Sequence, residues 1–68
     1  MIDYTILIPE LRSAMNITQE DLANLLNVTS VTVSRWENGK TTPTKIIKIK
    51  LNKLFERYDI KVEAHQND

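Results

Sequence analysis

One side of the segment that begins at Ser30 and ends near Glu37 carries short polar side chains and one arginine. On a helical wheel, Val31, Ser34 and Arg35 lie together, and Asn38 follows on the same side. Serine and valine are weak helix formers, and a face that only meets solvent would carry more Glu and Lys. Hydroxyl groups both donate and accept hydrogen bonds, and a guanidinium donates several from a planar fork. This face is therefore predicted to contact another molecule.

Two bulky residues mark the opposite side of the same segment. Val33 and Trp36 fall there, where they would pack against a neighbouring helix. Thr29 is a suitable N-cap, and Gly39 is the residue type that most often ends a helix. We therefore predict a helix over residues 30–37 with one buried face and one outward face.

A second helix is predicted immediately before it, over residues 19–26. Thr18 can cap this helix, with Asp21 completing a short version of the capping box. Asn27 follows, and asparagine tolerates the left-handed conformation that a chain reversal needs, so that Val28 can enter the core. The buried face of the helix is predicted to comprise Leu22, Ala23, Leu25 and Leu26.

Two further helices are predicted on either side of this pair. Proline suits a first helical turn, so Pro9 is expected to begin a helix that ends near Met15, with Leu11 and Met15 inward. The last helix follows the Thr-Thr-Pro-Thr loop. Its predicted core face comprises Ile47, Leu51, Leu54, Phe55 and Tyr58. Ile46 and Ile49 lie among lysines on the far side, and we expect them to be exposed in a monomer.

The two ends of the chain alternate between apolar and polar residues, which is typical of half-buried strands. The pattern covers Ile2 to Ile6 at one end and Tyr58 to Ala64 at the other. The prediction is that these segments pair with each other or across a dimer, and the alternative is frayed termini. Residues 65–68 are expected to be disordered. The predicted dimerisation residues are Ile46, Ile49, Tyr58, Ile60 and Val62.

Length and composition predict one domain, spanning residues 1–68 with a core at 8–58. A chain of 68 residues, 41% of them apolar and none cysteine, can close one modest core without disulfides. The predicted fold class is mainly α, a compact bundle of four to five short helices with short terminal strands. Residues 28–58 carry seven basic and two acidic side chains, although the whole chain is neutral. This basic middle either faces a phosphate backbone or is a solvated, lysine-covered helix.

The sequence lacks the usual groupings of an enzyme. It has no glycine-rich phosphate loop and no cysteine nucleophile, and its one histidine, His65, lies in a polar tail. We therefore expect no enzymatic activity, no cofactor and no metal site. The first residues lack the features of a signal peptide or membrane span, so a cytoplasmic location away from membranes is expected.

Read as one unit, residues 18–39, TQEDLANLLNVTSVTVSRWENG, resemble the lambda-repressor and Cro-like (XRE) helix-turn-helix family. The resemblance extends over about residues 8–57 without gaps. Two departures stand out. The family usually has glycine where this chain has Asn27, and it usually has five helices where four are predicted here.

The resemblance implies that the helix at 30–37 enters the major groove of double-stranded DNA and that the helix at 19–26 crosses the backbone. The implied base-reading residues are Ser30, Val31, Ser34 and Arg35. The implied phosphate-binding residues are Gln19, Thr29, Thr32, Asn38, Lys40, Thr41 and Thr42. For Arg35 the alternative is a surface ion pair with Glu37 or Glu20, and for Gln19 a purely solvated role.

Three functional hypotheses follow from these observations. The first is a sequence-specific transcriptional regulator, repressor-like, that acts as a homodimer on a palindromic operator. The second is an antitoxin-type protein of prokaryotic or phage origin that binds DNA and also neutralises a partner toxin, or another antagonist, through the strand at 58–64. The third is an oligomerisation module without a role on DNA.

Overall fold

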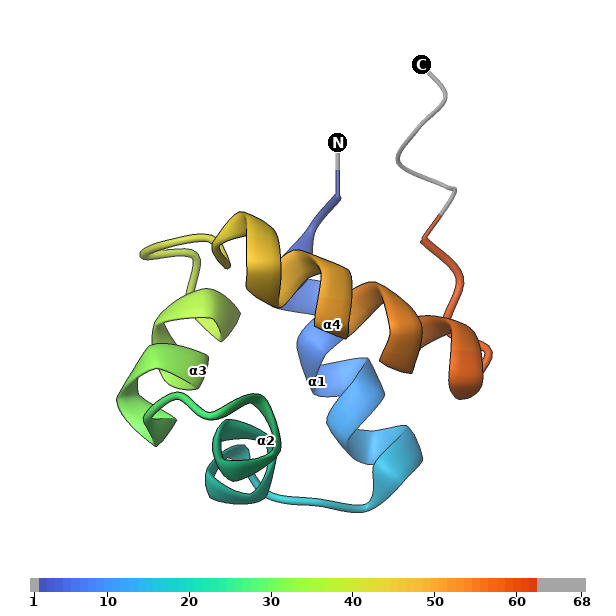
Figure 1. Cartoon of the computed structure of the whole chain (residues 1–68), viewed down its shortest axis with the longest axis horizontal. Helices are drawn as coiled ribbons and strands as arrows, with labels where there is room; N and C mark the ends of the chain where they lie inside the picture. The colour runs from blue at the N-terminus through green and yellow to red at the C-terminus, as the bar shows by residue number, and fades with distance from the viewer. Residues whose placement is uncertain (1, 63–68) are drawn as a thin grey trace.

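The structure, a computed structural model, describes residues 2–62 and contains four α-helices (Figure 1). The helices are α1 (Tyr4–Met15), α2 (Gln19–Leu26), α3 (Ser30–Glu37) and α4 (Lys45–Arg57). The predicted mainly α bundle is confirmed, and α2 and α3 have the predicted bounds. No strand forms within residues 2–62, so the predicted terminal strands are wrong over that range. The remainder of the C-terminal strand prediction and the tail prediction fall outside the described residues.

The first helix begins five residues earlier than predicted. Asp3 caps it by accepting a hydrogen bond from the N–H of Thr5 at 3.1 Å. The residues that α1 buries have helical rather than strand spacing: they are Tyr4, Leu7, Ile8 and Leu11. Ile6, which the strand pattern placed beside Tyr4, is exposed.

Pro9 consequently lies in the second turn of α1 rather than in the first. A proline inside a helix removes one backbone hydrogen bond and costs about 3 kcal/mol. Burying a large apolar side chain contributes about 1.5–3 kcal/mol. Because the extension of α1 buries Tyr4, Leu7 and Ile8, the gain exceeds the cost of Pro9.

One or two residues after the end of each helix lies a residue in the left-handed conformation, with φ between 60° and 75°. The next residue donates its N–H to a carbonyl five positions back, which closes the helix end as a Schellman motif. The left-handed residues are Asn16, Asn27, Gly39 and Asp59. Asn27 thus performs the turn for which the family usually has glycine.

The same motif explains why the chain after α4 is not a strand. Asp59 reverses the chain, and the N–H of Ile60 donates to the carbonyl of Phe55 at 2.7 Å. Ile60 is therefore turned back onto the core and buried. Tyr58, predicted to face the core, is the C-cap residue and is exposed.

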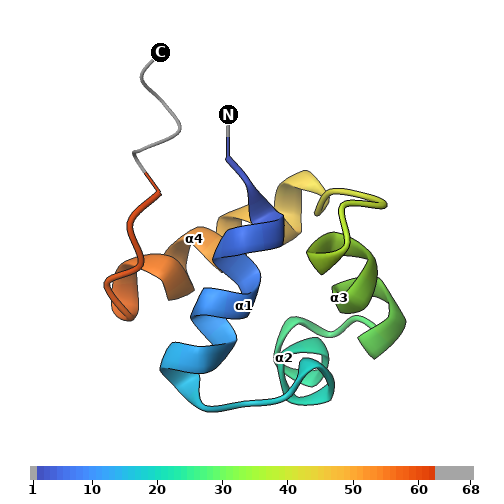
Figure 2. The ribbon, with the colours of Figure 1, turned by 180° about the vertical axis from the view of Figure 1, so that it is seen from behind.

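The core lies where the four helices meet. It is formed by Tyr4, Leu7, Ile8, Leu11, Leu22, Ala23, Leu26, Val33, Trp36, Ile47, Leu51, Phe55 and Ile60. Leu25 was predicted to belong to it but is 54% exposed, because α2 turns only Leu22, Ala23 and Leu26 inward. The view from behind shows α1 crossing α4 (Figure 2), and the ammonium of Lys48 lies 6.0 Å from the Tyr4 ring centre.

We predict that Pro9→Ala stabilises the protein. The alanine restores an N–H for the carbonyl of Thr5 in the second turn of α1, and we expect the free energy of unfolding to rise by about 1–3 kcal/mol. Urea denaturation measures this change. Ser13→Ala, at an exposed position of the same helix, is the control and should change stability by no more than about 0.5 kcal/mol. An unchanged or lowered stability for Pro9→Ala would contradict the extended α1.

Candidate nucleic-acid interface

The outward face of α3 is held in place by α2 and the turn between the two helices. Thr18 and Asp21 form a capping box at the start of α2, with hydrogen bonds of 3.0 and 3.1 Å. At its end, Asn27 reverses the chain and Val28 packs against the core. Thr29 then caps α3 by accepting from the N–H of Thr32 at 3.2 Å. These contacts join α2 and α3 into one unit.

The two faces of α3 differ as the sequence predicts. Val33 is fully buried and Trp36 is 3% exposed, and both belong to the core. On the other side, Val31 is 56% exposed and Arg35 is also exposed. Figure 1 shows α3 at one edge of the bundle, so this side meets no other helix.

A shallow open depression of about 510 Å³ follows this outer side of α3 and the start of the next loop. It brings together six of the predicted contact residues: Val31, Ser34, Arg35, Asn38, Lys40 and Thr41. No carboxylate lines it, and two of its lining residues are cations. The depression is therefore suited to an anionic ligand with both polar and apolar edges.

Hydrogen bonds fix two of the polar groups in the depression. The side-chain amide of Asn38 donates to the carbonyl of Ser34 at 2.9 Å and to its hydroxyl at 3.2 Å. Because the Ser34 hydroxyl accepts from Asn38, its own proton is available for an acceptor on a ligand. Arg35 has no ion pair within residues 2–62, so the predicted alternative pairing with Glu37 or Glu20 does not occur there.

The other five predicted contact residues, of which Gln19 is one, lie outside the depression. The hydroxyls of Thr29 and Thr32 lie 3.0 Å apart and belong to the cap of α3. Ser30 and Thr42 are exposed but do not line it. Pro43, which follows directly, is buried and so anchors the loop that carries Lys40 to Thr42.

An ion pair that the sequence reading missed joins α1, α2 and α3. Arg12 donates to the carboxylate of Glu37 from Nε at 2.7 Å and from Nη2 at 3.2 Å. Gln19 donates its side-chain amide to the same carboxylate at 2.9 Å, and Arg12 Nη1 donates to the carbonyl of Ile17 at 3.3 Å. The hydrogen bond to Glu37 raises the pKa of Arg12.

This network changes the interpretation of Gln19. Its amide, predicted to bind phosphate, is occupied by Glu37, whose side chain is only 9% exposed. One feature of the sequence is consistent with the ion pair: Arg12 is the only basic residue among the first 27, in a segment with four acidic side chains. Its partner could not be identified because the chain offers nine carboxylate side chains.

The predicted dimerisation residues divide into two groups. Ile49, Ile60 and Val62 line a second hollow, of about 560 Å³, together with Ile2. The other two, Ile46 and Tyr58, are exposed outside it, and Ile46 is 68% exposed. The expected exposure of Ile46 and Ile49 is confirmed for this single chain.

Residues 2–62 contain neither a metal-binding cluster nor a membrane-spanning helix. Residues 2–62 hold no group of three or more His, Asp or Glu side chains placed to bind a metal ion. None of the four helices is both long and apolar enough to span a membrane. His65 lies outside the described residues.

We predict that the Arg12–Glu37 pair contributes measurably to stability and that its two members are coupled. Arg12→Met leaves the carboxylate of Glu37 without its cation, and it should lower the free energy of unfolding by about 1–3 kcal/mol. Adding Glu37→Leu should recover part of this loss, because no unpaired charge remains. A double-mutant cycle by urea denaturation tests this coupling, and strictly additive effects would refute it.

Comparison with known proteins identifies the family. A family model described as Helix-turn-helix matches residues 9–61, which is most of the chain and includes α2, α3 and α4. A search of curated proteins and a search of solved structures found no match to the chain. The matched family is one of DNA-binding regulatory domains rather than enzymes. The chain therefore belongs to the XRE-type, lambda-repressor-like helix-turn-helix family.

Proposed function

We propose that this protein is a transcriptional regulator that reads a specific double-stranded DNA sequence with the outer face of α3. The observation that carries the proposal is the depression along α3, which gathers Arg35, Ser34 and Val31 without a carboxylate. An anionic duplex meets cations and hydroxyls there, together with one exposed aliphatic side chain. This combination matches the edges that base pairs present in the major groove.

Four side chains of α3 are proposed to read bases. Arg35 donates two parallel hydrogen bonds to the O6 and N7 atoms of a guanine, since its guanidinium is exposed and has no ion pair within residues 2–62. Val31 contacts the methyl group of a thymine. Ser34 donates its hydroxyl proton to a base or phosphate acceptor, and Ser30, at the start of α3, does the same.

The residues around α3 are proposed to bind phosphates and so fix its register on the duplex. Lys40, Thr41 and Thr42 do so from the loop after α3, next to Asn38. For Gln19 the proposed donor is the backbone N–H in the first turn of α2. The hydrogen bonds of the α2 cap engage other groups, namely the N–H of Thr18, Asp21 and Leu22.

We further propose that two copies bind a palindromic operator as a homodimer. A single domain of this size makes few DNA contacts, and joining two multiplies their affinity. The hollow lined by Ile2, Ile49, Ile60 and Val62 supports this, because it places apolar side chains from both ends of the described chain on one surface. The alternative antitoxin role would use the 58–64 segment as a docking strand, whereas Ile60 is turned into the core.

We predict distinct losses for two cations of the depression. Arg35→Ala should weaken binding to the preferred site by roughly 1–3 kcal/mol and relax the preference at one base pair, because a bidentate base contact is lost. Lys40→Ala should weaken all sites alike and reduce the slope of log affinity against log salt by about 1. Selection from a random duplex library, followed by titration at several salt concentrations, measures both. Arg57→Ala, at an exposed cation of α4 outside both the depression and the hollow of the proposed dimer, is the control. Failure to enrich any sequence with the unsubstituted protein would contradict the proposal.

We predict that Ile49→Lys dissociates the dimer without unfolding the monomer. Ile49 is 51% exposed in the single chain, so a lysine costs little there, whereas at an apolar interface it would be desolvated. Sedimentation velocity measures the change in mass, and circular dichroism verifies the fold. Ile6→Lys, at an exposed position of α1, is the matched control. A dimer that survives Ile49→Lys, or a protein that is monomeric at all concentrations, would refute this interface.

A further inference from the structure

A third hollow, of about 430 Å³, lies between α2 and α4. Its apolar part comes from Leu25, Leu26 and Leu54, of which Leu25 is 54% exposed and Leu54 half-buried. Neither terminal segment of the described chain lines it. The hollow thus leaves the side chain of Leu25 and part of Leu54 open to solvent at a junction of two helices.

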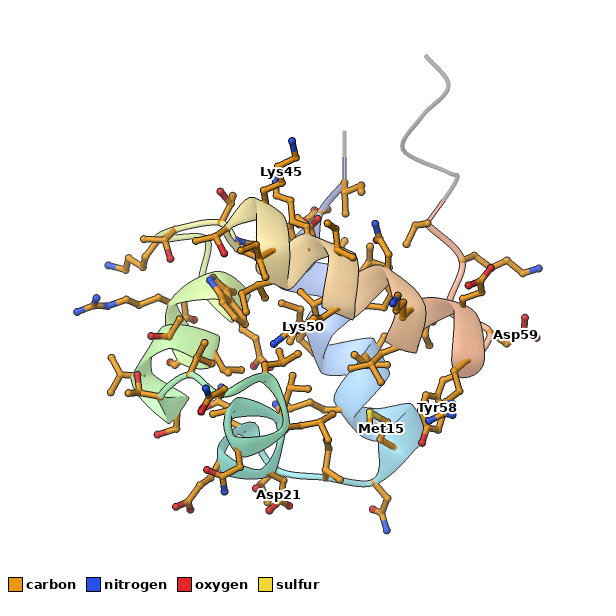
Figure 3. All side chains as sticks on the ribbon, viewed as in Figure 1. Met15, Asp21, Lys45, Lys50, Tyr58 and Asp59 are labelled. Atoms are coloured by element: carbon orange, nitrogen blue, oxygen red, sulfur yellow. The ribbon has the colours of Figure 1, made fainter. Side chains whose placement is uncertain are left out.

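Three cations from α4 also line this hollow. Lys50, Lys53 and Arg57 follow one another at intervals of three and four residues, so they lie on one side of the helix. No carboxylate lines the hollow, and the salt bridge found within residues 2–62 is the distant Arg12–Glu37 pair. Figure 3 shows Lys50 on the side of α4 that faces α2. The hollow therefore presents positive charge without a carboxylate beside its apolar side chains.

This hollow is separate from the surface proposed to read DNA. It shares no residue with the depression along α3. Its cations come from the later half of α4, whereas α3 occupies the opposite edge of the bundle (Figure 1). A ligand in the hollow would leave the outward face of α3 uncovered.

We propose that the hollow between α2 and α4 binds an acidic amphipathic helix of a partner protein. Apolar side chains on one face of that helix would contact Leu25 and Leu54, and carboxylates beside them would pair with Lys50 and Arg57. Charge complementarity selects an acidic partner. The apolar part of the hollow selects a protein, because phosphate groups have no apolar surface with which to cover two leucines.

The small apolar part of the hollow argues against a lipid surface as the occupant. A membrane-binding face inserts a broad apolar surface, with cations at the level of the headgroups. Here the apolar side chains open to solvent are limited to Leu25 and part of Leu54, beside three cations. Because the hollow and α3 are separate, the partner and DNA bind at the same time, and the partner would be recruited to the operator.

The test uses the full chain, isotope-labelled for NMR, and a stapled helical peptide of about 15 residues. The peptide carries leucines on one face and glutamates beside them, and its matched control replaces every glutamate with lysine. We expect the acidic peptide to shift the backbone resonances of Leu25, Lys50, Leu54 and Arg57, and the basic peptide to shift none. The double variant Lys50→Glu/Arg57→Glu should bind the acidic peptide at least about tenfold more weakly and should bind the basic peptide instead. Lys45→Glu, at an exposed position of α4 outside the hollow, should bind like the unsubstituted protein.

Several results would overturn the proposal. One is a failure of the acidic peptide to bind, and another is equal binding by the double variant and the unsubstituted protein. Others are a shift of the same resonances on self-association, on adding duplex DNA, or on adding vesicles of anionic phospholipid. Each of those results would assign the hollow to another occupant. The charge-swapped pair keeps the test decisive, because a misfolded double variant would bind neither peptide.

Discussion

The burial of Val33 and Trp36 is the constraint on which the rest of the structure depends. A helix of eight residues is marginal by itself, so α3 exists because these two side chains are packed into the core. Once they point inward, the 100° step of the helix turns Val31 and Arg35 outward. The direction in which the recognition surface faces is thus a consequence of core packing.

The Arg12–Glu37–Gln19 network fixes the orientation of α3 relative to α1 and α2. Apolar contacts between helices tolerate small rotations, whereas a guanidinium and an amide that share one carboxylate require a defined geometry. Glu37 is the last residue of α3, and its partners come from α1 and α2. The network therefore fixes the C-terminal end of α3. Asn38 and Lys40, which follow this end, belong to the proposed DNA-binding surface. A loss at Glu37 would be felt in DNA binding as well as in stability.

The sequence was sufficient to predict the central part of the fold and insufficient for its edges. The caps Thr18 and Thr29 and the stops Asn27 and Gly39 are local signals, so α2 and α3 have the predicted bounds. At the two ends of the chain, the same few apolar residues fit both the alternation of a strand and the spacing of a helix. In addition, Pro9 favoured a prediction in which α1 begins too late. Only the burial of Tyr4 and Leu7 decides for a helix, and burial depends on contacts distant in sequence. The strand predicted from Tyr58 onward was wrong because the chain reverses at Asp59. Aspartate adopts the left-handed conformation less readily than glycine, so the sequence did not indicate this turn. For the site, the helical wheel of α3 correctly predicted that Val31 is exposed and Val33 buried. A helical wheel cannot predict which of the nine carboxylates pairs with Arg12, because that contact joins two helices.

The central claim is that the outer face of α3, and no other surface, contacts the bases. Methyl NMR of the protein saturated with its selected duplex measures this directly, through intermolecular nuclear Overhauser effects. The account predicts such effects between the Val31 methyl groups and base protons in the major groove, and none from the buried Val33. Effects to bases from Ile46 or Ile49 on α4, with none from Val31, would contradict it.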